Sequence, residues 1–533
     1  MRRVPTGKTG ATEEPAIALM AISPRDSKPL KILMASSEAV PFAKTGGLAD
    51  VAGALPLELA RLGHDVRLVI PRYGTLDQSG HRLTEYARIT VPSASGSIEA
   101  VVERTTLHPS NSSFRGSVSV FAVRHDPFFL RPGLYQERGV DYPDNLERFC
   151  FFSRAVLELL IAFQRVDEWK PDLLHLHDWQ TALCAVYLRT LYAGRPEVAG
   201  VRSILTLHNV AYQGLFPGER FAETGLPAAL FTPAGLEFYG SLNLLKGGIL
   251  FADFLTTVSP TYSQEIQTPE YGFGLEGVLA QRKDRLVGLV NGVDVEVWNP
   301  AADPLIPARY SSADLSGKSM CKRALQRELD LPASDGPLLG VVSRLTVQKG
   351  LDLLVSIVPE LMELDLQLAV LGTGDPECEA ELRSLHAKFP RKIGVRIGFD
   401  EGLAHRIEAG ADMFVMPSRY EPCGLSQLYS LRYGTVPIVR RTGGLADTVV
   451  PYSPLAVRER RATGFMFGEA TPHALLTVIC LALCVYQDRG AWRSLIDAGM
   501  RTEVSWVGSA QAYVDLYRRV VRSASQVEGA AEP

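Results

Sequence analysis

Two cations and one carboxylate in the second half of the chain are well suited to chemistry. Arg344 and Lys349 lie five residues apart around a predicted strand-to-helix loop, and Glu421 follows a predicted strand at 413–416. A guanidinium can hold two oxygens at once and an ammonium supplies a point charge, so the two cations suit a diphosphate. The alternative is that both cations are solvated loop residues.

Glycine turns surround these residues. In the stretch 413–447, Gly424 opens one predicted helix, and Thr442, Gly443 and Gly444 precede a second. A helix N-terminus directs free N–H groups and the positive end of its dipole at whatever lies in front of it. Two such termini facing one crevice predict an anion site.

The sequence of the second turn occurs twice. TGGLAD stands at 442–447 and again at 45–50, directly after Lys44. Glycine turns are common in α/β proteins, but a six-residue repeat across this distance is not expected by chance. The repeat predicts a site with two walls, each built around the same turn.

Carboxylates that could hold a metal are poorly placed. The candidates are Asp294 with Glu296 in one turn and Asp141 with Asp144 in another. Neither pair follows a strand in the way that a metal-bound diphosphate site requires. We therefore expect charge neutralisation by cations, without a metal and without a cofactor.

Two further patterns allow other chemistry. His175 and His177 alternate on a predicted strand, as two metal ligands would, but alternate residues also share one face of a core. With no third ligand nearby, a structural or substrate-contacting role is favoured. GTGD at 372–375 follows a strand but lacks the third glycine of a dinucleotide-binding loop, so a nicotinamide enzyme is disfavoured.

The elements around these residues predict an α/β fold with parallel sheets. Order is expected to begin at Lys31, with a strand at 32–35, a helix that Gly63 stops, and a strand at 66–70. Two later strands, within 171–177 and 203–207, each lead into a histidine. If these strands are neighbours, the histidines mark a site at the carboxyl edge of the sheet.

Length and punctuation predict two domains. A chain of 533 residues exceeds one ordinary core, and a new strand and helix series starts after three prolines between 300 and 307. A final amphipathic helix is expected at 510–521, with Ser509 as its N-cap. The expected segments are a flexible extension at 1–29, domains at 30–299 and 300–505, a helix at 506–523 that crosses back to the first domain, and a flexible tail at 524–533.

Composition excludes several classes of partner. The net charge of −4 gives no general attraction to nucleic acid or to an anionic membrane, and no apolar run reaches the ~20 residues that span a bilayer. The seven cysteines include no CxxC pair, which indicates a reducing compartment, and Cys480 and Cys484 are expected to be neighbours in the core. A cytoplasmic location is expected, or a plastid in a plant, and the oligomeric state is left open.

Several long motifs resemble bacterial glycogen synthases and plant starch synthases, in the order found in that family. The likeness covers roughly residues 31–523. The motifs are KTGGLADV at 44–51, HLHDW at 175–179, HNVAYQG at 208–214, the run from FYGSLNLLKGG to NGVD at 238–294, VSRLTVQKG at 342–350, SRYEPCGLSQLYSLRYGT at 418–435 and RRTGGLADTV at 440–449.

The resemblance implies a fold, a reaction and its catalytic residues. The fold is two Rossmann-like domains facing across a deep cleft, the GT-B type. The enzyme would transfer glucose from ADP-glucose to the non-reducing 4-hydroxyl of an α-1,4-glucan such as glycogen, with retention, although ADP versus UDP stays open. Glu421 would orient the sugar, His208 would lie beside the anomeric carbon, and Arg344 and Lys349 would neutralise the diphosphate.

The resemblance also implies substrate-binding residues in both domains. Lys44 would contact the diphosphate or the glucose, and the amides of Gly424 and Leu425 would face the distal phosphate. Phe399 stands where related enzymes place an aromatic ring against adenine; many have Tyr there, so stacking is kept and a hydroxyl is lost. The full set is Lys44, Gly46, Gly47, Asp50, Asp178, Asn291, Phe399, Cys423, Gly424, Leu425, Thr442, Gly443 and Gly444.

Two of these implied roles come in groups. Thr442, Gly443 and Gly444 would line the diphosphate and glucose end of the donor site. Asp178 and Asn291 would belong to the sugar and acceptor pocket; from the residues alone they are strand-end hydrogen-bonding groups.

Retention leaves two routes open. Glu421 is the obvious nucleophile for a double displacement. The alternative is a same-face transfer in which the departing phosphate oxygen takes the acceptor's proton, and we favour it because no clear acid and base pair accompanies Glu421.

Two other functions are also weighed: a sugar-nucleotide enzyme with a small acceptor or an epimerase, and a silent glucan-binding protein. The second predicts the loss of key charges, yet Lys44, Arg344, Lys349 and Glu421 are all present.

Overall fold

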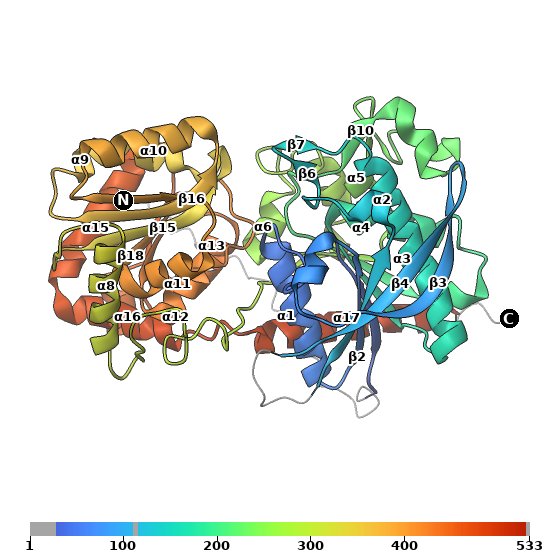
Figure 1. The fold of residues 1–533 in the computed structure, drawn as a ribbon, viewed down its shortest axis with the longest axis horizontal. Helices are drawn as coiled ribbons and strands as arrows, with labels where there is room; N and C mark the ends of the chain where they lie inside the picture. Colours follow the sequence, from blue (N-terminus) through green and yellow to red (C-terminus); the bar gives the residue numbers. More distant parts are fainter. Residues whose placement is uncertain (1–27, 110–115, 529–533) are drawn as a thin grey trace, which may run out of the picture.

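The computed structural model describes residues 28–109 and 116–528, with side chains as far as residue 522. It contains two α/β lobes, drawn in blue to green and in yellow to red in Figure 1. The expected extension at 1–29 lies almost wholly outside the described residues, as does half of the expected tail at 524–533.

The N-terminal lobe is built on a nine-stranded sheet. Seven of its strands run parallel to one another, and the antiparallel β4 and β3 extend one edge. In spatial order the strands are β14 (Leu286–Gly288), β13 (Phe254–Thr257), β9 (Arg202–Leu207), β8 (Leu173–His177), β1 (Lys31–Ala35), β2 (Asp65–Pro71), β5 (Val118–Arg124), β4 (Gly96–Leu107) and β3 (Thr84–Ser93).

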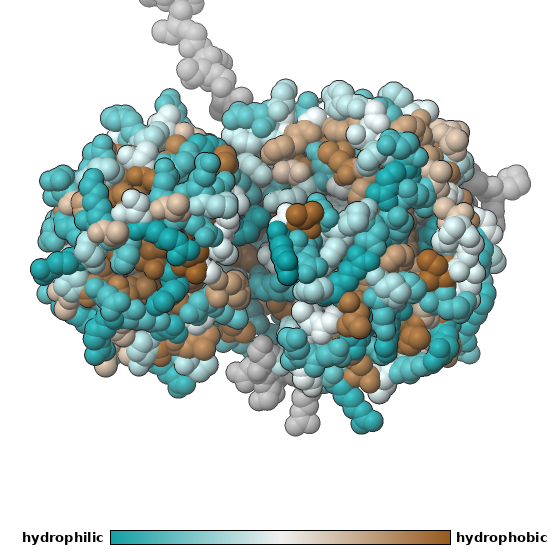
Figure 2. Space-filling view, turned by 45° about the horizontal axis from the view of Figure 1, so that its top comes forward, coloured by the Kyte–Doolittle hydropathy of each residue, from teal (hydrophilic) through white to brown (hydrophobic). Residues whose placement is uncertain are grey.

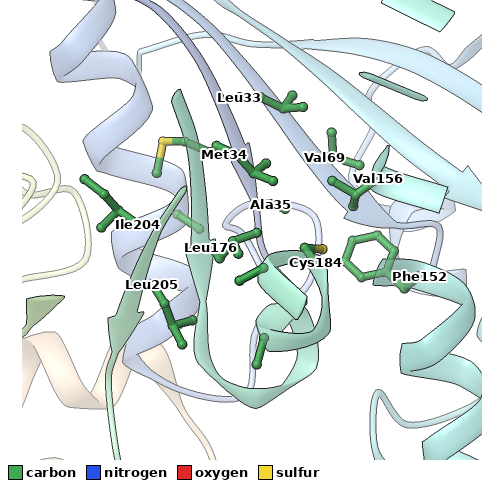
Figure 3. Packing of buried hydrophobic residues seen from close by; sticks show 14 of the residues in the cluster. Leu33, Met34, Ala35, Val69, Phe152, Val156, Leu176, Cys184, Ile204 and Leu205 are labelled. Atoms are coloured by element: carbon green, nitrogen blue, oxygen red, sulfur yellow. The ribbon is translucent and has the colours of Figure 1, made fainter. Parts of the chain in front are cut away.

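Buried strands and helices form the core of this lobe. β1 lies between β2 and β8, with Ile32 opposite Val66 on one side and Leu173 on the other. Figure 3 shows this packing, in which Phe152 lies beside Cys184. The helices are α1 (Gly47–Arg61), α2 (Asp126–Phe129), α3 (Asn145–Asp167), α4 (Asp178–Arg189), α5 (Leu244–Phe251), α6 (Pro260–Glu265) and α7 (Glu276–Gln281).

Two small sheets complete the N-terminal lobe. One pairs β12 (Ser241–Asn243) with β10 (Leu215–Pro217) and β11 (Glu237–Phe238). The other joins β6 (Gln136–Glu137) to β7 (Val140–Asp141).

The C-terminal lobe has one parallel sheet of six strands. In spatial order they are β17 (Ile393–Ile397), β16 (Gln367–Gly374), β15 (Leu338–Leu345), β18 (Met413–Met416), β19 (Val436–Arg440) and β20 (Phe465–Phe467). Its helices are α8 (Ser316–Glu328), α9 (Leu351–Leu361), α10 (Pro376–Lys388), α11 (Glu401–Gly410), α12 (Ser426–Tyr433), α13 (Gly443–Thr448), α14 (Pro454–Arg458), α15 (Pro472–Gln487) and α16 (Arg489–Arg501).

Both sheets have a point where the strand order reverses. In the N-terminal sheet the chain builds outward from β1 through β2 and later continues on the other side with β8. In the C-terminal sheet the same happens between β15 and β18. Ligands of open α/β sheets bind beyond the carboxyl ends of the strands at such a point. The loops after these four strands carry most of the predicted site residues.

The last helix, α17 (Trp506–Glu528), leaves the C-terminal lobe and lies along the N-terminal one (Figure 1). Tyr513 and Tyr517 are buried in the N-terminal core. Ser509 was predicted to cap this helix, and this is wrong: the helix begins at Trp506, and the Ser509 hydroxyl donates to the carbonyl of Val290 at 2.7 Å. The limits at residues 299 and 505 stay proposed domain boundaries.

Other sequence predictions meet mixed outcomes. The strands at 32–35, 66–70 and 413–416 are confirmed, and β8 and β9 are neighbours as expected. The helix α10 was missed, because its apolar residues are few. Cys484 is exposed and Cys480 is only half-buried, so their prediction as core neighbours is wrong. None of the seven cysteines forms a disulfide in the described structure.

No single described helix is long and apolar enough to span a membrane. The helices α15 and α16 meet that test only as a pair, and they are bent by 108° relative to each other.

Candidate active site

The first TGGLAD turn braces the loop after β1. Glu38 is buried in this loop, and it accepts hydrogen bonds from the Thr45 amide at 2.5 Å, the Thr45 hydroxyl at 2.6 Å and the Gly46 amide at 3.3 Å. Tyr135 donates to the same carboxylate at 2.6 Å. The N-cap of α1 is therefore fixed by a glutamate of its own lobe, and the amide of Gly47 has no hydrogen-bond partner among the described residues.

Lys44 and Asp50 lie at the two ends of this turn. The Lys44 ammonium is 2.7 Å from an Asp50 carboxylate oxygen, and both side chains are partly exposed. An exposed pair of this kind adds little stability, so the lysine can exchange partners at small cost. That property suits a cation that must reach a ligand.

The strands β8 and β9 place Asp178 and His208 side by side. The Asp178 carboxylate accepts from the backbone amide of His208 at 2.7 Å. Burial raises the pKa of Asp178 to about 7, opposed by hydrogen bonds from the backbones of His208 and Asn209. Burial lowers the pKa of His208 to about 3, so its imidazole is neutral at physiological pH.

The carboxylate of Glu421 is paired inside the C-terminal wall. Glu421 is 5% exposed, and one of its oxygens accepts from the Lys349 ammonium at 2.6 Å and from the Ser418 hydroxyl at 3.0 Å. Lys349 comes from the loop after β15, and Glu421 from the loop after β18. The reversal point of the sheet thus brings together two residues that lie 72 positions apart.

Arg344 reaches across to the N-terminal lobe. Its guanidinium donates to the Tyr212 hydroxyl at 3.2 Å and to Gln348 at 3.3 Å. Nearby, the rings of Phe273 and Tyr420 meet edge to face across the same boundary, with centroids 5.4 Å apart. The two predicted walls are therefore in contact.

Asn291 and Cys423 also join the two lobes. Burial raises the pKa of the Cys423 thiol to about 12, and hydrogen bonding by Asn291 opposes this. On the other side of the same loop, a Cβ atom on Gly47 would lie 3.7 Å from a methyl group of Leu425. The space-filling view shows the hollow between the lobes (Figure 2).

The two glycine turns of the C-terminal wall differ in their free amides. Gly424 has a φ of 72°, and within the described structure neither its amide nor that of Leu425 has a hydrogen-bond partner. These two N–H groups precede α12 and remain available to an anion. By contrast, the Gly444 amide donates to the backbone carbonyls of Glu421 and Pro422, both at 3.1 Å.

The amide of Gly443 is held by a residue that the sequence did not point to. Glu265, at the end of α6 in the opposite lobe, accepts from the Gly443 amide with both oxygens at 3.1 Å and from the Thr442 hydroxyl at 3.0 Å. Burial raises the pKa of Glu265, and these hydrogen bonds oppose the rise. A carboxylate of the protein thus occupies one of the two helix N-termini that were predicted to bind an anion.

Asp447 strengthens this contact between the lobes. Its carboxylate accepts from the hydroxyl of Ser259 at 2.5 Å and from the hydroxyl and amide of Thr261 at 2.5 and 3.1 Å. A signal for the contact was present, because SPTYSQE follows a strand at the carboxyl edge where the site was expected. Its partner could not be read from the sequence.

Phe399 is 82% exposed in the loop between β17 and α11. An aromatic side chain with so much free surface is unusual, and it suits a flat ligand that would cover it. Its role against adenine stays a prediction.

The weaker metal candidates have other partners. Asp294 accepts from the backbone amides of Glu296 and Val297 in a turn, and Asp144 pairs with Arg131 at a distance of 2.5 Å. Among the described residues, no group of three or more His, Cys, Asp or Glu side chains could hold a metal ion.

The fold and this site together define a class of enzyme. Two α/β lobes with parallel strands place the carboxyl edges of their sheets against each other, and Arg344, Lys349 and the free amides of Gly424 and Leu425 lie where the lobes meet. This is the architecture of GT-B glycosyltransferases.

Comparison with known proteins leads to the family. The model of the starch synthase catalytic domain matches residues 31–281, and that of glycosyl transferases group 1 matches residues 323–483. A glycogen synthase from Anaeromyxobacter sp. (strain Fw109-5) is 50% identical over 491 residues, which cover 92% of this chain and 99% of the relative. Glycogen synthase 2 from Geobacter sulfurreducens is 48% identical over 492 residues, which cover 92% of this chain and 98% of the relative.

A solved structure agrees with these relatives. The catalytic domain of starch synthase IV from Arabidopsis thaliana, bound to ADP and acarbose, superposes with a TM-score of 0.84 at 33% identity. The match covers 93% of this chain and 100% of that one. The chain belongs to the glycogen and starch synthase family of glycosyltransferases.

Proposed function

We propose that this protein transfers glucose from ADP-glucose to the non-reducing 4-hydroxyl of an α-1,4-glucan, with retention of configuration. The proposal rests on family membership and on one observation above all, the pair of half-buried Lys349 and buried Glu421 at the boundary of the two lobes. Lys349 is near enough to Glu421 to order it and can present its other N–H donors to a diphosphate. A single cation would then serve both the sugar side and the leaving group.

The donor site that we propose combines three cations with two backbone amides that have no partner in the described structure. Arg344 and Lys349 neutralise the diphosphate, the amides of Gly424 and Leu425 receive its distal phosphate, and Lys44 approaches from the other lobe. The Gly443 amide is left out, because Glu265 already satisfies it.

The residues around the sugar and the base follow from the same placement. Phe399 stacks on the adenine, and Glu421 orients the glucose. His208, Asp178 and Asn291 face the sugar and the acceptor from the N-terminal lobe and from its boundary.

The chemical step that we propose is a same-face transfer. The bond between the anomeric carbon and the phosphate oxygen breaks, the acceptor 4-oxygen bonds to that carbon, and the acceptor's proton passes to the departing phosphate oxygen. Negative charge grows on the diphosphate as the bond breaks, and fixed cations stabilise it there. Contact between the lobes keeps out water, which would otherwise hydrolyse the donor.

The Glu421 oxygen that accepts from Lys349 and Ser418 is turned toward its own wall. This favours an orienting role over attack on the sugar. We expect Glu421→Gln to yield no glucosyl-enzyme with a slow donor. A competent covalent adduct, isolated from the wild type or trapped in Glu421→Gln, would replace this route with a double displacement.

The function is tested by incubating the purified protein with ADP-glucose, with and without a glycogen primer. We expect the primer to be elongated. A competition assay with ADP-glucose and UDP-glucose at equal concentrations identifies the preferred donor. Release of free glucose without elongation, or no turnover with either donor, would contradict the proposal.

We also propose a cytoplasmic location, since seven unpaired cysteines suit a reducing compartment.

A further inference from the structure

Three imidazoles form a row beneath the site. The rings of His175 and His177 are both fully buried, with centroids 4.2 Å apart, and the centroids of His177 and His208 are 5.3 Å apart. His177 Nδ1 lies 3.0 Å from His208 Nε2, which is a hydrogen-bond distance. A neutral imidazole has one N–H and one bare nitrogen, so one of the two facing nitrogens carries the proton.

The other nitrogen of His177 decides which one it is. His177 Nε2 is buried and has no hydrogen-bond partner in the described structure. If His208 donated to His177, the remaining proton of His177 would have to sit on Nε2, as a buried N–H without an acceptor. Orphaned buried N–H groups are rare in native proteins. The opposite arrangement leaves only a bare nitrogen at that position.

The polar groups of His175 and Thr181, which flank His177, already have partners of their own. Both nitrogens of His175 are used, Nδ1 by the Tyr517 hydroxyl at 2.8 Å and Nε2 by the Thr206 hydroxyl at 2.6 Å. The Thr181 hydroxyl is engaged with the backbone of His177, at 2.7 Å from its amide. Burial lowers the pKa of His177 well below its ordinary value, so a doubly protonated ring does not provide a way out.

We propose that His177 is a positioning residue: it donates from Nδ1 to His208 Nε2 and so holds His208 as the tautomer with its proton on Nδ1. His208 Nδ1 has no hydrogen-bond partner in the described structure. The ring therefore offers a fixed hydrogen-bond donor to a sugar hydroxyl in the site. This last step rests on the proposed function, and the tautomer itself does not.

Helix α17 supports this arrangement from below. Tyr517 holds the ring of His175, and His175 lies against His177. The C-terminal helix thereby holds His175, which makes no hydrogen bond to His177. It does not contribute to the bond between His177 and His208, which makes Tyr517 a suitable control.

Neutron diffraction from a deuterium-exchanged crystal tests the tautomer directly. We expect deuterium on Nδ1 of His177 and on Nδ1 of His208, and none on the other nitrogen of either ring. Deuterium on Nε2 of His208, or on both of its nitrogens, would overturn the proposal. This result stands even if the protein fails to elongate a glucan, so the two failures are distinguishable.

Two substitutions of similar size test the role of the bond. His177→Asn keeps an N–H donor near the position of Nδ1, and His177→Leu removes it. We expect kcat/KM within about threefold of wild type for Asn and a loss of about tenfold for Leu, the equivalent of one neutral hydrogen bond. Tyr517→Phe removes a buried hydroxyl that bonds to His175 and not to His177 or His208. It should leave kcat/KM unchanged while it lowers the unfolding midpoint. Equal losses for Asn and Leu would overturn the proposal, and if neither variant folds, the neutron map decides.

Discussion

The sequence TGGLAD appears once in each lobe, and the two copies make the same kind of hydrogen bonds to different structural ends. In both, a threonine hydroxyl and a glycine amide hold a glutamate. The partner of Thr45 is Glu38 in its own lobe, whereas the partner of Thr442 is Glu265 in the opposite lobe. The first copy braces a loop, and the second joins two lobes.

The aspartates that end the two copies differ in the same way. Asp50 pairs with Lys44, six residues earlier in its own loop. Asp447 receives donors from Ser259 and Thr261 of the opposite lobe. The identical residues determine which hydrogen bonds can form. The position of each copy relative to the boundary between the lobes determines the partner of those bonds.

The largest expected effect is on turnover, and it differs between the lysine of the C-terminal wall and the lysine of the N-terminal wall. Lys349→Ala should lower turnover by about 10²–10³-fold, because it removes a charge that the leaving group needs. Lys44→Ala should cost about tenfold, since Lys44 is 39% exposed and can be replaced in part by water. Glucan elongation assays measure both, with the exposed Lys388→Ala as control. Equal losses at the two lysines would break the comparison.

The two glutamates should separate stability from activity. Glu38→Ala leaves several part-buried donors unpaired, so we expect about 2 kcal/mol of destabilisation and a lower unfolding midpoint. Glu265→Ala should lower kcat/KM about tenfold with little change in the midpoint, because it weakens the contact between lobes rather than a core. Thermal unfolding and kinetics on the same preparations would show it. The reverse pattern would mean that the two turns have exchanged roles.

Asp447 offers a quantitative measure of the boundary. In a double-mutant cycle on kcat/KM, Asp447→Asn and Thr261→Ala should couple by about 1 kcal/mol, as contacting residues do. The matching cycle of Asp50→Asn and Lys44→Ala should give a smaller coupling in unfolding, because that pair is exposed. Additive effects of Asp447 and Thr261 would show that their bonds do not form in solution.

A further expected effect concerns the dependence of stability on pH. Asp178 has a folded pKa of about 7 against an ordinary value of 3.8, so between these values the folded protein holds a proton that the unfolded chain releases. Its contribution therefore lowers the free energy of unfolding as pH rises through this range. Asp178→Asn should lose this component. Subtracting its profile of unfolding free energy against pH from that of the wild type therefore isolates the contribution of Asp178. Parallel profiles would place Asp178 in a more solvated position than the structure does.

Much of the architecture followed from periodicity and glycine placement. The strands that lead to Asp178, Lys349 and Glu421 were predicted where they occur, because short apolar runs end there in polar loops. The anion-site interpretation of both glycine turns also followed, yet only one has free amides. The competitor, Glu265, lies nearly 180 residues from its partner, and no local pattern encodes a contact between domains.

Local rules also fail where tertiary packing intervenes. Ser509 was the best N-cap by residue type, but its hydroxyl bonds to Val290 and the helix starts earlier. The bond between His177 and His208 could not be foreseen either, because it depends on the register of two neighbouring strands.

A crystal structure of the protein with bound ADP tests the difference between the two turns most directly. We predict that the distal phosphate lies at the amides of Gly424 and Leu425, between Lys349 and Lys44, while Glu265 keeps its bonds to Thr442 and Gly443. A phosphate bound at the Gly443 amide, with Glu265 displaced, would contradict the account.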